Sequence, residues 1–143
     1  MTHCAGYRAA AVAEASRFAA IGIDAEPHTG LAPGVLEAVA VPVERDHVRR
    51  LIWVDSNVHW DVLLFSAKES VYKACFPLFN LELGFHDVAL EFTPATRSFS
   101  ATVSDPGEGA RPFRVLTGRW SVARGLILTA VAVPQVDTSW GTF

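Results

Sequence analysis

Ile21-Gly22-Ile23-Asp24-Ala25-Glu26 is the stretch around which the fold is predicted, because it has the pattern of a β-strand end that carries two acids. Side chains alternate across a strand, so Gly22, Asp24 and Glu26 face the same side. Gly22 removes bulk beside the acids and would let a ligand or another backbone approach closely. Pro27 then ends the hydrogen bonding of the strand. The two acids repel each other unless a cation or a raised pKa relieves them, although acids are also common at solvated strand ends.

A second segment, Phe65-Ser66-Ala67-Lys68-Glu69-Ser70-Val71-Tyr72-Lys73, has the pattern of a helix. Glu69 and Lys73 are four positions apart and share one helix face, with Lys68 and Tyr72 alongside. An acid in this largely apolar face is partly desolvated, which strengthens its hold on a cation. The simpler interpretation is a surface Glu–Lys pair worth roughly 0.2–0.5 kcal/mol to an isolated helix. The two segments together supply three acids that could converge on one divalent cation: Asp24, Glu26 and Glu69.

The remaining pattern predicts one α+β domain, in which an antiparallel sheet packs against a long helix. The predicted strands are residues 7–13, 17–26, 88–92, 98–103, 114–122 and 126–133. The first two are expected to pair as a hairpin through residues 14–16. The predicted helices are residues 35–39, 44–51 and 59–75, with Ser56 or Asn57 near the start of the last one. Residues 105–109, rich in Gly and Pro, are expected to form a loop.

Composition is that of a globular protein. With 143 residues and 50% hydrophobic content, the chain can bury one core. The charged fraction of 19% is below the roughly 25% that is typical, so we expect apolar surface left over for a partner. No apolar run approaches the ~18 residues that span a membrane, and the N-terminus lacks a basic-then-apolar signal pattern. These features predict a cytoplasmic protein with no membrane partner.

Several kinds of site are disfavoured by what the sequence contains. The two cysteines, Cys4 and Cys75, have neither a zinc spacing nor a disulfide framework around them. None of the 10 glycines falls in a phosphate-loop pattern, so phosphate binding would come from side chains and a metal. Nothing resembles a basic surface with interleaved aromatic residues, which makes nucleic acid an unexpected partner. Arg45, Arg49 and Arg50 form a basic cluster that could meet an acidic partner or simply be solvated.

The two acidic segments carry a family resemblance. The string Gly-Ile-Asp-Ala-Glu-Pro-His at residues 22–28, with Glu69 45 positions after Asp24, resembles the two-part signature of 4'-phosphopantetheinyl transferases. The wording of both motifs is closer to the larger, Sfp-type or EntD-like bacterial enzymes than to the small holo-acyl-carrier-protein synthases. Thr2-His3, before a predicted strand, resembles the Ser/Thr-His element of those larger enzymes. The resemblance runs from Thr2 to about Val133, nearly the whole chain.

This resemblance implies transfer of the 4'-phosphopantetheine group from coenzyme A to a serine hydroxyl of an acyl or peptidyl carrier protein, releasing 3',5'-ADP. The transfer would depend on Mg²⁺, with Mn²⁺ as a substitute, and the matching acids would be the metal ligands. Glu69 is the first choice for the base that takes the serine proton. We expect its replacement, or that of Asp24, by Ala to abolish transfer and leave folding largely intact. The matching residues expected to contact the phosphates of coenzyme A are Lys68, Lys73, Thr2 and His3, and Lys73 is also counted as catalytic with Glu69.

The resemblance also implies an incomplete pocket. Sfp-type enzymes have two similar halves with the coenzyme A site between them, and residues 1–143 resemble the second half alone. We expect a single half-domain that is a fragment, a domain of a larger protein, a product of a gene start assigned too late, or a half that assembles with copies of itself. The alternative function is an isolated metal-binding half-domain without turnover, which needs a partner half or self-association. Another Mg²⁺-dependent phosphotransferase or nuclease would explain the acids but not the ordered lysines.

Overall fold

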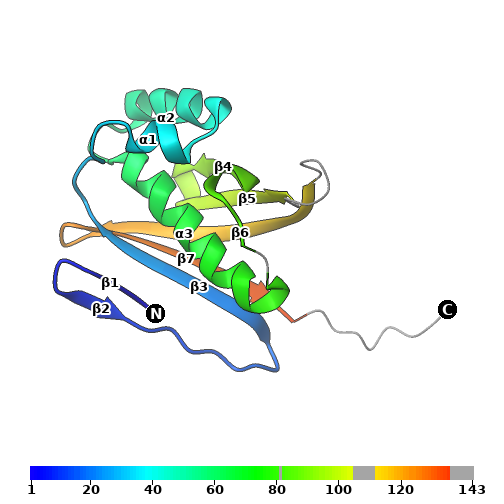
Figure 1. The fold of residues 1–143 in the computed structure, drawn as a ribbon. Helices are drawn as coiled ribbons and strands as arrows, with labels where there is room; N and C mark the ends of the chain where they lie inside the picture. Colours follow the sequence, from blue (N-terminus) through cyan, green and yellow to red (C-terminus); the bar gives the residue numbers. More distant parts are fainter. Residues whose placement is uncertain (81, 105–111, 136–143) are drawn as a thin grey trace.

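A long helix, α3 (Trp60–Phe79), crosses one face of a five-stranded antiparallel sheet (Figure 1). The computed structural model describes residues 1–80, 82–104 and 112–135. The strand order is β3-β7-β6-β5-β4, and every neighbouring pair is antiparallel. The strands are β3 (Phe18–Pro27), β4 (Val88–Thr93), β5 (Ser98–Ser104), β6 (Pro112–Ala123) and β7 (Leu126–Pro134). This arrangement confirms the predicted α+β fold.

Two shorter helices, α1 (Val35–Val39) and α2 (Pro42–Val54), lie beside the N-terminal half of α3 (Figure 1). Two short 3₁₀ turns, η1 (Phe85–Asp87) and η2 (Pro94–Thr96), flank β4. Helix α3 runs four residues past the predicted end at residue 75, because Asn80 closes it in a left-handed conformation with a φ of 50°. Among the described residues, no helix is long and apolar enough to cross a membrane. The predicted loop at residues 105–109 lies outside the described residues.

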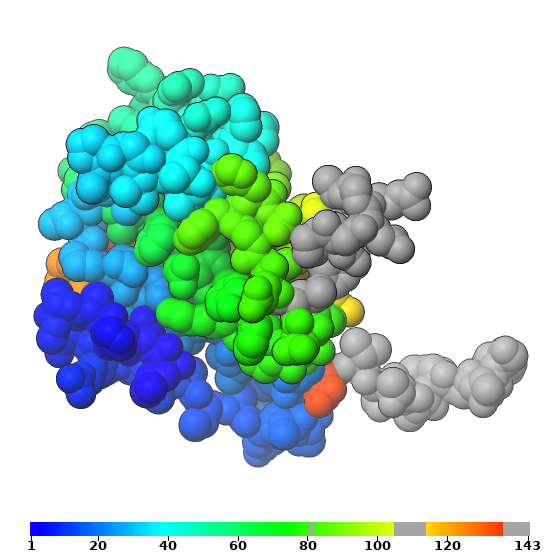
Figure 2. Space-filling view, viewed as in Figure 1, coloured from blue at the N-terminus to red at the C-terminus, as the bar shows by residue number. Residues whose placement is uncertain are grey.

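The N-terminal hairpin differs from the prediction. β1 (Thr2–Cys4) pairs with β2 (Tyr7–Ala9), whereas β3 pairs with β7. The predicted pairing of residues 7–13 with 17–26 is therefore wrong. The physical reason is the turn at Ala5 and Gly6, which have φ angles of 40° and 82° and connect the two short strands with the twist that a hairpin requires. Figure 2 shows this hairpin, in blue, packed below the cyan α1–α2 region on the same face of the molecule.

The core lies between α3 and the inner face of the sheet. Alternate residues of β4 and β5 are buried, as the period of a strand requires. The helix contributes a broad apolar side because it is covered by the sheet on one side and by α1 and α2 on another. Its fully buried apolar residues are Leu63, Leu64, Ala67, Val71, Ala74 and Cys75.

Gly22 marks the place where β3 comes closest to α3. A Cβ atom at this position would lie 1.8 Å from the carbonyl oxygen of Ser70 and 2.7 Å from the backbone nitrogen of Ala74. The sequence predicted that either a ligand or another backbone segment would approach Gly22. In the structure it is the backbone of α3 that does so. Because Asp24 and Glu26 share the face of Gly22, this close approach turns both acids toward α3.

Candidate active site

The carboxylate of Asp24 is the centre of the site and joins three elements. Asp24 is only 4% exposed, and Ser66 Oγ donates to its Oδ2 at 2.8 Å. Lys73 Nζ donates to Oδ1 at 2.6 Å, and Thr2 Oγ1 donates to the same oxygen at 3.2 Å. Ser66 and Lys73 are seven positions apart on α3, which is close to two helical turns, so both reach the same carboxylate. Strand β3, helix α3 and the N-terminal hairpin therefore meet at Asp24.

A second layer of hydroxyl groups lies under this carboxylate. Thr129 Oγ1 is 3.0 Å from Ser66 Oγ and donates to the Ser66 carbonyl oxygen at 2.9 Å. Thr129 stands directly opposite Asp24 in the β3–β7 register. Neither residue was predicted from the sequence to belong to the site. The seven-residue spacing from Lys73 could have indicated Ser66, whereas Thr129 is found only once the pairing of β3 with β7 is known.

Glu26 and Glu69 complete a negatively charged cluster around Lys73. Burial, and then the charge of Asp24, raise the pKa of Glu69, while Lys73 opposes the shift. The pKa of Glu26 is raised mainly by burial, then by Asp24; Lys73 lowers it and Glu69 raises it. The three predicted acids thus act on one another electrostatically, and their repulsion is relieved in part by one ammonium group.

The fit of this cluster to a divalent cation is partial. Carboxylate oxygens are the donors that Mg²⁺ prefers. However, no three His, Cys, Asp or Glu side chains in the described part of the chain are grouped closely enough to hold a metal ion. Oδ1 of Asp24 accepts the ammonium of Lys73 instead. The metal-ligand role of Asp24, Glu26 and Glu69 therefore stays a prediction, with a lysine ammonium as the cation that this structure contains.

We expect Glu69→Gln to change the pH dependence of stability. Because burial raises the pKa of Glu69 above its ordinary 4.5, ionising it costs folding free energy. The cost is absent when the pH lies below the ordinary pKa. It grows as the pH rises from the ordinary pKa to the raised pKa. In metal-free buffer, the variant should therefore gain stability relative to the parent chain between about pH 4 and pH 7. Urea unfolding at stepped pH measures the difference, and a flat or opposite trend would contradict the cause given for the shift.

The two lysines predicted to contact phosphate have different surroundings. The side chain of Lys73 is 30% exposed, and in the described part of the chain its ammonium bonds only to Asp24. Lys68 is 1% exposed, and its ammonium donates to Glu44 Oε2, the Val39 carbonyl and the Phe85 carbonyl at 2.7–2.8 Å. Burial lowers the pKa of Lys68, and its bond to Glu44 opposes that shift. Lys73 can therefore meet an anion from solvent, whereas Lys68 has all three donors directed into the protein.

The predicted Thr2-His3 element is also divided by the structure. Thr2 is buried, and besides its bond to Asp24 it accepts the backbone N–H of Ala25 at 3.2 Å. His3, the next residue on β1, points the other way and is exposed. Thr2 thus fastens the hairpin to β3, and the phosphate contacts predicted for both residues stay predictions.

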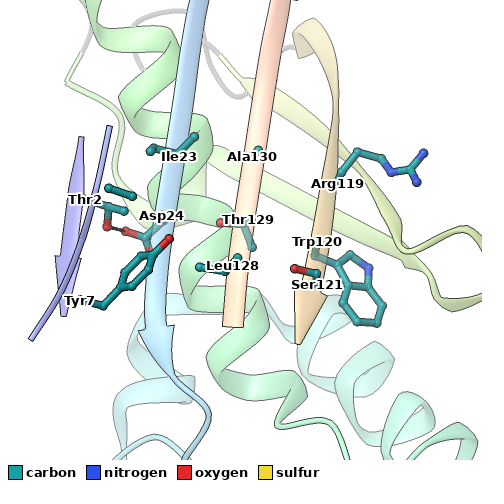
Figure 3. Close-up of a pocket in the computed structure, with 11 residues that line it drawn as sticks. Thr2, Tyr7, Ile23, Asp24, Arg119, Trp120, Ser121, Leu128, Thr129 and Ala130 are labelled. Carbon is teal, nitrogen blue, oxygen red and sulfur yellow. Dashed lines mark hydrogen bonds between the residues drawn. The ribbon is translucent and has the colours of Figure 1, made fainter. Parts of the chain in front are cut away.

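Two hollows flank the acidic cluster. The first, of about 380 Å³, opens between the hairpin and the sheet, with Thr2, Tyr7 and Asp24 at one end and Arg119 and Ser121 at the other (Figure 3). The second, of about 370 Å³, lies between α3 and the chain leading to β4. It is lined by Lys68, Glu69, Tyr72, Glu82, Leu83, Gly84, Phe85 and Val88. Asp24 thus lines one hollow and Glu69 lines the other, so the charged cluster can act on groups bound on either side.

Comparison with known proteins bears on the family to which this chain belongs. Residues 20–124 match the family model described as the 4'-phosphopantetheinyl transferase superfamily. The chain is 48% identical over 135 residues to the 4'-phosphopantetheinyl transferase Svp of Streptomyces mobaraensis. It is 44% identical over 139 residues to PptT of Mycobacterium tuberculosis and 44% identical over 142 residues to Npt of Nocardia iowensis, both also named 4'-phosphopantetheinyl transferases.

The alignments cover 92–93% of this chain and 55–63% of the three relatives, so the chain spans little more than half of their length. The family match includes the whole of the two acidic segments, from Gly22 to Lys73. The resemblance inferred from those segments is therefore confirmed, and the chain belongs to the 4'-phosphopantetheinyl transferase superfamily.

Proposed function

We propose that this chain carries the catalytic acids of a 4'-phosphopantetheinyl transferase, which moves 4'-phosphopantetheine from coenzyme A to a serine hydroxyl of an acyl or peptidyl carrier protein. The observation that supports this most is the buried Asp24, which shares one cluster with Glu26, Glu69 and Lys73. Three acids around one cation form a site that favours added positive charge and can act on a pyrophosphate. The names of the three relatives point to the same chemistry.

The metal in this proposal is Mg²⁺, with Mn²⁺ as a substitute, held by oxygens of Asp24, Glu26 and Glu69. When bound, the metal supplies positive charge for the phosphate oxygens of coenzyme A. Lys73 contacts a phosphate in the same step, since its partly exposed ammonium can leave Asp24 for another anion. His3 and Thr2 are assigned the 3'-phosphate, with His3 as the exposed member of the two.

The acceptor is activated by Glu69 in this proposal. Its carboxylate takes the proton of the carrier serine, and the raised pKa brings it closer to the neutral range in which a general base works best. The serine oxygen forms a bond to the phosphorus of the 4'-phosphate. The bond from that phosphorus to the bridging oxygen breaks, and its electron pair leaves with 3',5'-ADP. Charge and atoms balance without another reactant.

We propose further that residues 1–143 form one half of the working enzyme, as the coverage of the relatives suggests. The other half would come from a longer chain or from a second copy of this one. The alternative is a half-domain that binds the metal without turnover. Sedimentation of the chain with coenzyme A and Mg²⁺ distinguishes a self-assembled oligomer from a monomer that requires a separate half.

The test is to incubate the chain with apo carrier protein, coenzyme A and Mg²⁺ and to measure the intact mass of the carrier. We expect one phosphopantetheine per carrier molecule, and none with Glu69→Gln. Glu91→Gln is the matched control, since Glu91 is exposed on β4 and its side chain points away from the core. A folded chain whose melting temperature rises with Mg²⁺ but that adds no mass would support the half-domain alternative. A chain that neither responds to Mg²⁺ nor transfers would overturn the proposal.

A further inference from the structure

Lys68 and Glu44 form a buried pair that ties five segments together. The ammonium of Lys68, on α3, donates to the carbonyl of Val39 at the end of α1, to Glu44 on α2 and to the carbonyl of Phe85 in η1. The carboxylate of Glu44 accepts the backbone N–H of Val41 at 2.9 Å and that of Leu90, on β4, at 2.8 Å. Both side chains are 1% exposed. Every N–H of the ammonium has an acceptor, so no donor is left for a ligand.

This pair lies next to residues 82–87, which form one wall of the hollow beside Glu69 and are called the wall below. Lys68 and Glu69 are neighbours on α3 and both line that hollow, whose opposite side includes Leu83, Gly84 and Phe85. The ammonium bonded to the Phe85 carbonyl fixes this wall to the helix. The wall has local bonds of its own, since Gly84 N–H donates to Asp87 Oδ2 at 2.7 Å and Asp87 N–H donates to the Gly84 carbonyl at 3.1 Å. Within the described residues, the bond from Lys68 is the only side-chain hydrogen bond that joins this segment to α3.

We propose that Lys68, paired with Glu44, is a positioning residue that holds residues 82–87 against α3 and thereby shapes the carrier-binding side of the site next to Glu69. It acts through the wall and not by touching phosphate. The assignment to the carrier side rests on the proposed function, in which Glu69 takes the proton of the carrier serine. The statement that the buried ammonium of Lys68 holds residues 82–87 against α3 rests on the contacts alone.

The test compares the same substitution at two lysines of α3. Lys68→Met keeps an unbranched side chain of similar shape up to Cε and removes the ammonium, leaving Glu44 as an unpaired buried charge. We expect its melting temperature to fall by about 10 °C and the amide protons of Gly84 and Asp87 to lose protection from hydrogen exchange. Lys73→Met is the matched control and should keep that protection, because Lys73 does not bond to the wall.

The double variant Lys68→Met/Glu44→Gln keeps the test decisive if Lys68→Met fails to fold. Neither position 44 nor position 68 then carries a charge, so the double variant should recover most of the melting temperature. Its glutamine oxygen can still accept from Leu90, so the Leu90 amide should stay protected while Gly84 and Asp87 remain exchangeable. In transfer assays, KM for the carrier should rise about tenfold in the double variant, with a smaller change in kcat.

Two results would overturn the proposal. One is full protection of Gly84 and Asp87 in the double variant, which would mean that the wall needs no ammonium. The other is a Lys68→Met chain with unchanged melting temperature and weakened binding of 3',5'-ADP, as expected of a phosphate contact. If the parent chain transfers nothing, the proposed function fails by itself, and hydrogen exchange still decides whether Lys68 positions the wall.

Discussion

Asp24→Asn is expected to lower phosphopantetheine transfer by roughly 10²–10³-fold, a loss of the size seen when one preorganised charge-stabilising group is removed. Asparagine has nearly the shape of aspartate but no charge. Its one carbonyl oxygen can accept from Ser66, so the buried donor on α3 keeps a partner. The amide cannot form the ion pair with Lys73, and it adds no negative charge to the cluster with Glu26 and Glu69. The variant therefore separates the chemistry of Asp24 from its place in the fold.

Asp24→Ala is the less informative change, although the sequence suggested that it would leave folding largely intact. The structure gives a reason to expect a weaker fold instead, because three groups donate to the buried carboxylate. Truncation would leave the buried hydroxyl of Ser66 without its acceptor in β3, at a cost of about 1–3 kcal/mol. Lost transfer in Asp24→Ala would then mix a chemical effect with a weaker fold.

Asp46→Asn is a matched control for Asp24→Asn. Asp46 also forms an ion pair, with Arg49 at 2.7 Å, but both side chains are well exposed on α2. Exposed pairs contribute little, so we expect unchanged transfer and a change in unfolding free energy of less than about 1 kcal/mol. Intact-mass assays of the carrier and urea unfolding measure the two variants side by side. If Asp24→Asn keeps transfer within a few-fold of the parent chain, the acidic cluster is not the site of the reaction.

The elements around the site were predictable because their signals are local. Alternation along β3 placed Asp24 and Glu26 on one face, and the four-residue spacing of Glu69 and Lys73 placed both on one side of α3. The same periodicity could not predict which other elements pack against that side of α3. Lys68 is next to Glu69 in sequence, yet its partner Glu44 comes from another helix, 24 positions earlier. Such contacts depend on the packing of α1, α2 and η1, which no local pattern specifies.

The hairpin error has a similar origin. A run of small and apolar residues after Tyr7 favours a strand, but residues 10–13 are exposed and no strand pairs with them in the described structure. The turn at Ala5 and Gly6 outweighs the strand propensity of residues 10–13, because it pairs β2 with β1, the segment just before it in the chain. Thr2 thereby reaches Asp24, a contact between residues 22 positions apart that no local pattern in the sequence indicates.

Gly22→Ala is expected to produce the largest loss of stability, more than about 3 kcal/mol, and to disturb the site at the same time. The added Cβ would lie 1.8 Å from the carbonyl oxygen of Ser70 and 2.7 Å from the nitrogen of Ala74. Both atoms belong to the backbone of α3, so neither can move without shifting the helix. Relief requires β3 and α3 to separate, and Asp24, two residues along the same face, would then lose its 2.8 Å bond from Ser66.

Gly30→Ala provides the control for the change from glycine to alanine itself. Its added Cβ would meet only ordinary contacts, 3.6 Å from His59 Nδ1 and 3.7 Å from Asp61 Oδ2. We expect its unfolding free energy to stay within about 1 kcal/mol of the parent value. Urea unfolding of both variants, followed by tryptophan fluorescence, gives the comparison. Equal midpoints for Gly22→Ala and the parent chain would mean that β3 does not pass against Ser70. The close approach that turns Asp24 toward α3 would then also be wrong.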